Sequence, residues 1–453
     1  MKSKLFGSSG VRRIVNVDLT PILACRIGLA IATFSKAEKA VIARDTRVSG
    51  LMLENALVSG LLAAGVDINC LGIVPTPALA YLTKRLGADV GVMITASHNP
   101  PEYNGLKIFN KDGIAYDERS QDKIEKIIEN EHYVLADWHK IHETSYINED
   151  QIYIEMIEKA AKLDKKWHVV VDAGCGATYN FAPMIFNRLG CKVTAINAQP
   201  DGLFPARSPE PNRESLNSLA QIVQKLKADI GIAYDGDGDR TAFIDEKGNF
   251  VNFDRILAAY SAHIVKKGEF VVTNVEASMC VEKMVEKHGG KVIRTKVGDV
   301  YIAEAIKKHK AVFGGEPCGA WIHPQFHYCP DGILSSVILL KVLEKENLDL
   351  SELIAKTPKY ETLRTNIACK NEMKHKVVEK LGEDLKTAFP VYKEYSSIDG
   401  VRLAFEDCWI LARASGTEPL VRLTVEGESL KVAKEIMKKG VRLLKKIIGE
   451  TKD

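Results

Sequence analysis

The chain of 453 residues is too long for a single hydrophobic core, and at roughly 100–200 residues per domain it predicts three or four domains. Hydrophobic residues make up 46% of it and charged residues 27%, which is typical of an ordinary soluble globular protein. The formal net charge of +3 is too small at this length to indicate a nucleic-acid-binding surface.

No apolar run reaches the roughly 18 residues of a membrane span, and the N-terminus shows no signal-peptide core. The nine cysteines are scattered and form no CxxC pair, a pattern typical of a reducing compartment. We therefore expect a cytoplasmic protein that binds neither membrane nor nucleic acid.

Short β-rich runs alternate with longer helical patterns over most of the chain. Buried strands are predicted at residues 39–45, 89–97, 168–174, 192–198, 229–235 and 269–275. Apolar residues at helical spacing predict helices such as those at 49–65 and 215–228. This alternation predicts an α/β fold with largely parallel strand pairing. The lysine-rich stretch 429–450 is interpreted as a C-terminal helix with a solvated face.

An internal repeat divides the chain. "ADVGVMITASHNP…LKIFNKDG" and "ADIGIAYDGDGD…TAFIDEKG" share a buried strand, a polar loop, a second strand and a Lys-containing turn, and "KAVFGGEPCGAWIHP" repeats the first half. We expect three related α/β domains, each with one polar loop at the end of a central strand, where α/β sheets bind ligands. The predicted domains are 1–150, 151–252 and 253–360, followed by a smaller α+β domain at 361–453.

The first polar loop lies in "MITASHNPPEYNG", where Ser97 is followed by His98. Adjacent side chains on an extended segment point apart, so direct activation of Ser97 by His98 is not expected. Lys107 would return towards Ser97 if the loop folds back as a hairpin, and would then be a candidate acid/base group. Alone, this stretch is more typical of a structural turn.

The second loop, "YDGDGDR", places Asp235, Asp237 and Asp239 at alternate positions with glycines between them. Three carboxylates this close repel one another unless a cation lies among them, and the glycines allow them to converge. All-oxygen ligands favour a hard ion such as Mg²⁺. We therefore interpret the loop as a metal site, with a solvated acidic turn as the alternative.

In the third loop, "GGEPCGAWIHPQFHYC", glycines lie on both sides of Glu316, and Trp321 follows. A carboxylate together with an indole ring is suited to binding sugar hydroxyls. Cys318, His323, His327 and Cys329 imitate a zinc site, but their spacing matches no usual structural zinc pattern.

The last loop is "RASGTEPLVR", near the C-terminus. Guanidinium forks, hydroxyls and free backbone N–H groups suit a phosphate better than a plain turn. The residues that supply them are Arg413, Ser415, Gly416, Thr417 and Arg422.

Together these loops, one in each predicted domain, closely resemble the α-D-phosphohexomutase superfamily over almost the whole chain. "LFGSSGVR", "TASHNPPEYNG", "DGDGDR", "GGEPCG" and "RASGTEPLVR" are similar to its signatures and occur in the same order. The resemblance implies four domains around a central cleft, the first three sharing a mixed α/β fold. It also implies an intramolecular phosphotransferase that interconverts the 1- and 6-phosphates of hexoses.

The resemblance assigns roles to the loops. Ser97 would be phosphorylated in the resting enzyme, and its phosphate together with Asp235, Asp237 and Asp239 would hold one Mg²⁺. Lys107 and Arg240 match positions near the reacting groups, with His98 in support. Glu316, with Cys318 beside it, matches the residues that read sugar hydroxyls. The residues that bind the non-reacting phosphate in this superfamily correspond to Arg413, Ser415, Gly416, Thr417 and Arg422.

The same resemblance predicts the reaction course. Phosphorylated Ser97 would transfer its phosphoryl group to the free hydroxyl of a hexose or hexosamine monophosphate and give a hexose 1,6-bisphosphate. This intermediate, also the activator, would turn over before its other phosphate returns to Ser97. Phosphoryl transfer needs alignment and charge neutralisation above all.

Within the superfamily, "RTKVGDVYIAEAI" and "FGSSGVRR" resemble phosphoglucosamine mutases of the archaeal type, which act on glucosamine phosphates. Phosphomannomutase/phosphoglucomutase relatives share most of these features and are the alternative. The chain departs from the commoner loop Glu-x-Ser-Gly-His, because Cys318 and Ala320 replace the serine and the histidine; Trp321 and His323 are the candidates to compensate.

Two rival functions are a metal-dependent sugar phosphatase and a non-catalytic sugar-phosphate sensor. The sequence leaves open whether the chain forms a homo-oligomer.

Overall fold

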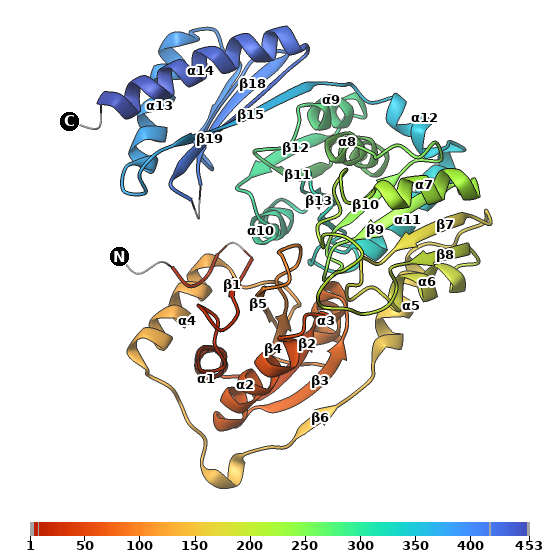
Figure 1. Ribbon diagram of the computed structural model, residues 1–453, viewed down its shortest axis with the longest axis vertical. Coiled ribbons are helices and arrows are strands. Elements are labelled where there is room, and N and C mark those ends of the chain that lie inside the picture. The colour runs from red at the N-terminus through yellow and green to blue at the C-terminus, as the bar shows by residue number, and fades with distance from the viewer. Residues whose placement is uncertain (1–3, 8, 416–417, 451–453) are drawn as a thin grey trace.

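The computed structural model describes residues 4–7, 9–415 and 418–450. Its strands form four sheets that follow one another along the chain. Figure 1 shows these sheets around an arc, from the red and orange first sheet at the bottom to the blue fourth sheet at the top. No helix within the described residues is long and apolar enough to cross a membrane.

The first sheet has six strands in the order β1-β5-β4-β2-β3-β6. The strands are β1 (Val11–Ile14), β2 (Lys39–Arg44), β3 (Asp67–Ile73), β4 (Val90–Ile94), β5 (Tyr103–Asn110) and β6 (Thr144–Tyr146). The helices of this part are α1 (Pro21–Ser35), α2 (Gly50–Ala63), α3 (Thr76–Arg85) and α4 (Glu118–Asn130), followed by the 3₁₀ turn η1 (Trp138–Lys140). β2 pairs in parallel with β3 and β4, whereas β5 is antiparallel to β1 and β4.

The second sheet has four strands in the order β10-β9-β7-β8. Its elements are α5 (Asp150–Ala160), β7 (His168–Asp172), α6 (Phe181–Arg188), β8 (Lys192–Ile196), α7 (Asn217–Leu226), β9 (Ile230–Tyr234) and β10 (Thr241–Ile244). β7 is parallel to β8 and β9, and β10 is the antiparallel edge.

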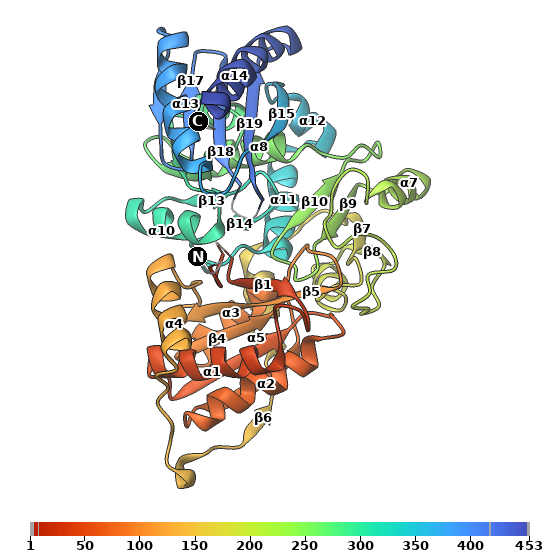
Figure 2. The same cartoon turned by 60° about the vertical axis from the view of Figure 1, so that its left-hand side comes forward.

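The third sheet repeats this plan in the order β12-β11-β13-β14. Its elements are α8 (Phe253–Ile264), β11 (Phe270–Asn274), α9 (Cys280–Lys287), β12 (Lys291–Thr295), α10 (Asp299–His309), β13 (Phe313–Gly315), β14 (Trp321–Ile322), α11 (Gly332–Glu346) and α12 (Leu350–Ala355). Figure 2 shows this sheet and its helices between the first sheet and the fourth.

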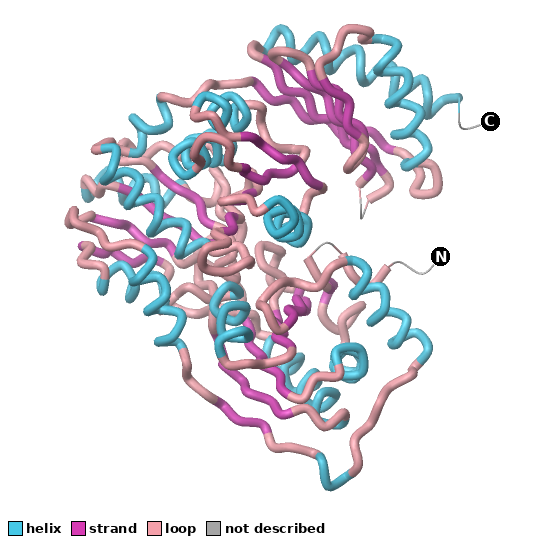
Figure 3. The backbone as a smooth tube through the Cα atoms, turned by 180° about the vertical axis from the view of Figure 1, so that it is seen from behind, coloured by secondary structure: helices cyan, strands magenta, loops and turns pink. Residues whose placement is uncertain are grey.

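The fourth sheet is wholly antiparallel, in the order β15-β19-β18-β17-β16. Its elements are β15 (Glu361–Ala368), α13 (Lys374–Ala388), β16 (Glu394–Ser396), β17 (Val401–Ala404), β18 (Cys408–Ala414), β19 (Leu420–Gly427) and α14 (Leu430–Glu450). Both helices cover one face of the sheet (Figure 3), and α14 is the predicted C-terminal helix.

The predicted α/β fold with a smaller C-terminal α+β part is therefore confirmed, and every predicted strand is present within three residues of its expected ends. The boundaries at 150, 252 and 360 remain our proposal. Each of them falls between the last strand of one sheet and the first strand of the next.

The internal repeat corresponds to three antiparallel hairpins. β4–β5, β9–β10 and β13–β14 each join a central or inner strand to an antiparallel neighbour. The turns of these hairpins carry Ser97, the three aspartates and Glu316. A repeated backbone plan thus delivers one polar loop from each of the first three sheets.

One large apolar cluster joins the first three sheets, and it includes Met93, Tyr234 and Trp321. The fourth sheet has its own core. A small cluster connects it to the third part, with Met279 on one side and Trp409 on the other. Since buried apolar area dominates cohesion, the first three parts form one body and the fourth is the more weakly attached.

Gly60 in α2 lies where the chain cannot accept a side chain, because a Cβ there would lie 2.1 Å from the carbonyl oxygen of Cys25 in α1. We expect Gly60→Ala to lower the free energy of unfolding by roughly 1–3 kcal/mol through overpacking. Thermal or urea unfolding measures this change. Gly449→Ala in α14 is the control, since nothing lies within 4 Å of its Cβ position, and its stability should stay equal or rise. Equal stability of both variants would contradict the close approach of α1 and α2.

Candidate active site

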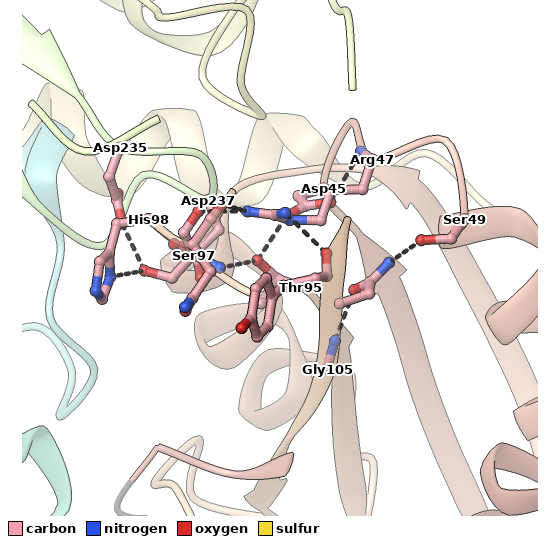
Figure 4. A network of polar contacts seen from close by, with 12 residues as sticks. Asp45, Arg47, Ser49, Thr95, Ser97, His98, Gly105, Asp235 and Asp237 are labelled. Carbon is pink, nitrogen blue, oxygen red and sulfur yellow. Dashed lines mark hydrogen bonds and ion pairs between the residues drawn. The ribbon is translucent and has the colours of Figure 1, made fainter. Parts of the chain in front are cut away.

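The Ser97 loop joins β4 to β5 and is completely buried at the serine itself. Ser97 has a φ of 52°, a left-handed conformation that is rare for a residue with a side chain. Its hydroxyl donates a hydrogen bond of 2.6 Å to Asp235 Oδ2, across the boundary between the first and second parts (Figure 4). The two predicted loops therefore meet through their central side chains.

His98 contacts Ser97, and the expectation that their side chains point apart is wrong. Ser97 Oγ lies 3.3 Å from His98 Nδ1 because the left-handed serine turns both side chains to the same side. Burial, together with the nearby guanidinium groups of Arg240 and Arg12, lowers the pKa of His98 to about 2. The imidazole is therefore neutral.

Asp235, Asp237 and Asp239 converge as predicted, with one carboxylate oxygen of each within 4.8 Å of the others. All three are buried, and in the described part of the chain no other group of His, Cys, Asp or Glu comes together in this way. Burial and the charges of Asp239 and Asp237 raise the pKa of Asp235 well above its ordinary value.

The donor set of this cluster fits a hard divalent cation. Asp237 Oδ1 and Asp239 Oδ1 are buried and accept no hydrogen bond from any described residue. Buried carboxylate oxygens without donors are costly unless a cation neutralises them, and oxygen ligands are those that Mg²⁺ prefers.

Lys107 lies in β5 opposite Met93, so the predicted hairpin is present. Its ammonium reaches Asp237 Oδ2 at 3.2 Å and also pairs with Asp239, rather than with Ser97. Burial opposes the charge of Lys107, but these carboxylates outweigh it and raise the pKa of the amine. The lysine therefore supplies a fixed positive charge to the acidic cluster.

Arg240 follows the cluster directly and links it to the third part. Its Nε lies 3.9 Å from Asp239 Oδ1, and its backbone bridges to Ala320 beside the Glu316 loop. Burial opposes its charge, but the neighbouring Cys318, Asp239 and further acidic groups raise the pKa of the guanidinium.

Two residues of the site were missed from the sequence. Arg12 in β1 donates to Asn99 Oδ1 at 3.3 Å, and its buried Nε has no partner among the described residues. Asp299, at the start of α10, has a buried oxygen, Oδ1, that accepts no hydrogen bond within the described residues. The charges of Arg12 and Asp299 interact electrostatically with those of Lys107 and Asp239. Arg12 belongs to the quoted stretch "LFGSSGVR" and Asp299 to the quoted stretch "RTKVGDVYIAEAI", and these two patterns could have identified them.

Glu316 is buried in the turn between β13 and β14, as predicted. Its Oε1 accepts hydrogen bonds from Asn274 Nδ2 at 2.8 Å and from the amide of Gly298 at 2.9 Å. Burial raises the pKa of the nearby Cys318 thiol to about 12, so this cysteine is not a nucleophile at neutral pH.

Trp321 and His323 do not compensate for the missing serine and histidine of this loop, and that expectation is wrong. Trp321 is fully buried and stacks on Tyr260 with ring centroids 4.8 Å apart. His323 is also buried, with its Nε2 2.9 Å from Ser335 Oγ. Both residues belong to the core of the third part.

The last predicted loop begins at the end of β18. Arg413 Nη2 pairs with Asp399 at 2.8 Å, and Nη1 pairs with Glu276 of the third part. Ser415 Oγ accepts a hydrogen bond of 3.1 Å from the amide of Glu418, and Arg422 lies opposite Arg413 on β19. Gly416 and Thr417 lie outside the described residues.

Comparisons with known proteins match all four parts. Models of the phosphoglucomutase/phosphomannomutase family match as alpha/beta/alpha domain I at residues 3–134, domain II at 151–248, domain III at 252–360 and the C-terminal domain at 365–442. A "probable phosphoglucosamine mutase" of Pyrococcus abyssi is 44% identical, with 98% of each chain covered. The phosphoglucosamine mutase of Methanocaldococcus jannaschii is 41% identical over 98% of this chain and 99% of that one.

A solved structure of a phosphoglucomutase/phosphomannomutase family protein from Burkholderia thailandensis has the same fold. Its TM-score is 0.88 at 29% identity, and the alignment covers 98% of this chain and 97% of that one.

We expect the acidic cluster to bind one divalent ion and Asp237→Asn to weaken that binding by at least about tenfold, because a charged ligand is lost. Titration of the purified protein with Mn²⁺, followed by electron paramagnetic resonance, measures the affinity. Asp245→Asn is the matched control, since this buried aspartate accepts hydrogen bonds from Lys247 and Asn249 outside the cluster. An equal loss in both variants would show that the cluster is not the ion site.

Proposed function

Because the chain belongs to the phosphoglucomutase/phosphomannomutase family of intramolecular phosphotransferases, we propose that it interconverts glucosamine 6-phosphate and glucosamine 1-phosphate. One observation carries the assignment to this site: the buried Ser97 hydroxyl donates directly to the acidic cluster. The sugar is proposed from the two full-length relatives described above, named phosphoglucosamine mutase or probable phosphoglucosamine mutase, which are 41% and 44% identical.

Ser97 is the proposed carrier of the phosphoryl group. In the first transfer the bond between phosphorus and Ser97 Oγ breaks, and a bond to the free sugar hydroxyl forms, giving a hexosamine 1,6-bisphosphate. The hydroxyl loses its proton to a base of the site, for which the neutral imidazole of His98 is the candidate. Lys107 already carries its proton, so of the predicted acid/base roles it can serve only as the acid. In the second transfer the other phosphate returns to Ser97, and the product keeps the first.

Asp235, Asp237 and Asp239 would hold Mg²⁺ together with the phosphate on Ser97. The ion, when bound, neutralises charge on the transferring group as a Lewis acid. The chain's own cations contribute in the same direction, since Lys107 and Arg240 stand against the acidic cluster. Because Ser97, Lys107 and the aspartates are buried, water competes poorly with the sugar hydroxyl for the phosphoryl group.

The non-reacting phosphate is the proposed ligand of the loop that starts at Arg413. Arg413, Ser415 and Arg422 of the described residues, with Gly416 and Thr417, supply the donors for it. Glu316 and the neighbouring Cys318 are the proposed contacts of the sugar hydroxyls. A phosphate-binding loop remote from Ser97 suits an intermediate that must present each of its two phosphates to Ser97 in turn.

Phosphomannomutase/phosphoglucomutase activity is the alternative within the family, because Cys318 and Ala320 depart from the common sugar loop. The cytoplasmic location stays a prediction from the sequence, which leaves the oligomeric state open.

Product analysis with Mg²⁺ and a trace of hexose bisphosphate tests the proposed reaction. We expect glucosamine 6-phosphate to give glucosamine 1-phosphate without stoichiometric inorganic phosphate, at a kcat/KM at least about tenfold above that for mannose or glucose 6-phosphate. Ser97→Ala should lose nearly all turnover and the added mass of one phosphate in intact-mass analysis. Free phosphate as the main product would indicate a phosphatase, and a tenfold preference for mannose phosphate would overturn the sugar assignment.

Glu276 forms an ion pair with Arg413, the proposed ligand of the substrate phosphate. The carboxylate and the phosphate are both negatively charged, so they compete for the same guanidinium. We expect Glu276→Gln to lower KM by about threefold to fivefold with kcat little changed, because a partly exposed ion pair is worth up to about 1 kcal/mol. Steady-state kinetics measures both constants.

Glu406→Gln is the control for this prediction, because Glu406 pairs with Lys283 across the same two parts without touching Arg413. An equal fall of KM in the control would attribute the effect to looser attachment of the fourth part.

A further inference from the structure

Arg47 makes more contacts with the Ser97 loop than any role proposed so far explains. It lies in the connection between β2 and α2 and is 1% exposed. Its guanidinium donates to the carbonyl oxygens of Ser97 at 3.0 Å, Asn99 at 2.6 Å, Pro100 at 2.6 Å and Tyr103 at 2.8 Å. Nε donates to Asp45 Oδ2 at 3.0 Å. These bonds use all five N–H donors of an arginine.

The loop needs these donors because it contains no regular structure of its own. Buried carbonyl groups without partners cost free energy, and a left-handed residue such as Ser97 adds about 1–3 kcal/mol of strain. A lysine could not replace the arginine, since its three donors radiate from one nitrogen and cannot span carbonyls from residue 97 to residue 103.

The same network also holds the amide of Ser97. Ser97 N donates to Thr95 Oγ1 at 2.8 Å, and Thr95 Oγ1 donates to Asp45 Oδ2 at 2.7 Å. Asp45 is the partner of Arg47, so the ring from Ser97 N through Thr95, Asp45 and Arg47 returns to Ser97 O (Figure 4). Both backbone polar groups of the serine are thereby tied to one buried ion pair.

The second part of the chain covers this ion pair. The ring of Phe204 lies 5.1 Å from the guanidinium carbon of Arg47, and a Cβ on Gly236 would lie 2.5 Å from Ser97 O. The network is therefore shielded from water where the serine loop meets the acidic cluster, which strengthens its hydrogen bonds.

We infer that Arg47 is a positioning residue for phosphoryl transfer, which fixes the direction of the Ser97 hydroxyl without touching the substrate. The inference rests on the proposed function of Ser97. During the reaction the serine alternates between a free hydroxyl and a phosphate, so its bond to Asp235 cannot hold it in both states. The backbone bonds to Arg47 and Thr95 involve no reacting atom and persist through both.

Arg47→Lys tests this role. We expect kcat to fall by at least about tenfold with KM changed by less than about twofold, because a misplaced nucleophile slows transfer while the phosphate grip stays intact. The rate at which glucose 1,6-bisphosphate phosphorylates Ser97, followed by intact mass, should fall by the same factor. Amide hydrogen exchange of the 97–103 segment should accelerate by at least about tenfold while exchange elsewhere in the protein changes little.

The double variant Asp45→Asn/Arg47→Gln separates positioning from charge burial, since it leaves no unpaired buried charge but replaces the five guanidinium donors with the two of a shorter amide. It should show the same loss of kcat. Arg255→Lys is the matched control, because Arg255 also donates to main-chain carbonyls, of Ile354 and Thr357, far from the serine loop. Its kcat should stay within about twofold of the wild type.

An equal fall of kcat in Arg255→Lys at an equal loss of melting temperature would overturn the inference, as would a rise of KM with kcat unchanged in Arg47→Lys. Hydrogen exchange does not depend on the sugar. A wild-type protein that fails on glucosamine phosphates therefore refutes the proposed substrate, whereas unchanged exchange and phosphorylation in Arg47→Lys refute the role of Arg47.

Discussion

The arrangement of the centre follows from the burial of three aspartates within 4.8 Å of one another. Such a cluster repels itself, and its counter-charges are Arg240 of its own loop and Lys107 of the first sheet. Lys107 of the first sheet pairs with Asp237 and Asp239, and Thr76 at the start of α3 donates to Asp237 through both its amide and its hydroxyl. Charge compensation therefore fastens the second part to the first, and Ser97 is brought to Asp235 by the same contact.

This fastening separates a rigid part from a looser one. The first three sheets share one large apolar core, whereas the fourth reaches the third mainly through Met279, Trp409 and a few neighbours. The proposed donor, Ser97, lies in the rigid part, and the proposed phosphate grip lies in the looser part. The bisphosphate intermediate must present first one phosphate and then the other to Ser97. This requires a fixed reacting centre and a phosphate-binding loop that can release its ligand, and the packing places the first in the rigid part and the second in the looser part.

The strands and the polar loops could be predicted because both leave local patterns, such as "DIGIAYD" followed by "GDGDR". The contact between Ser97 and His98 could not, since it depends on a left-handed backbone that nothing in the residue types announces. Arg413 was predicted as a phosphate ligand from its own loop, but its partner Glu276 lies in another sheet. Buried polar groups with distant partners give no periodic signal, and for that reason Arg47 was also missed.

Arginines that hold loop carbonyls occur in each of the first three parts; those of the first two parts are buried and that of the third is half-buried. Arg207 pairs with Asp172 and donates to the carbonyl of Tyr234, just before the acidic cluster. Arg294 pairs with Glu282 and donates to the carbonyl of Asn274, whose side chain in turn donates to Glu316. The acid and arginine are 2 residues apart at Arg47, 35 at Arg207 and 12 at Arg294, so no sequence repeat marks them. A polar loop at the end of a buried strand needs donors for its carbonyls, and each part meets that need with whichever arginine its own connections bring into reach.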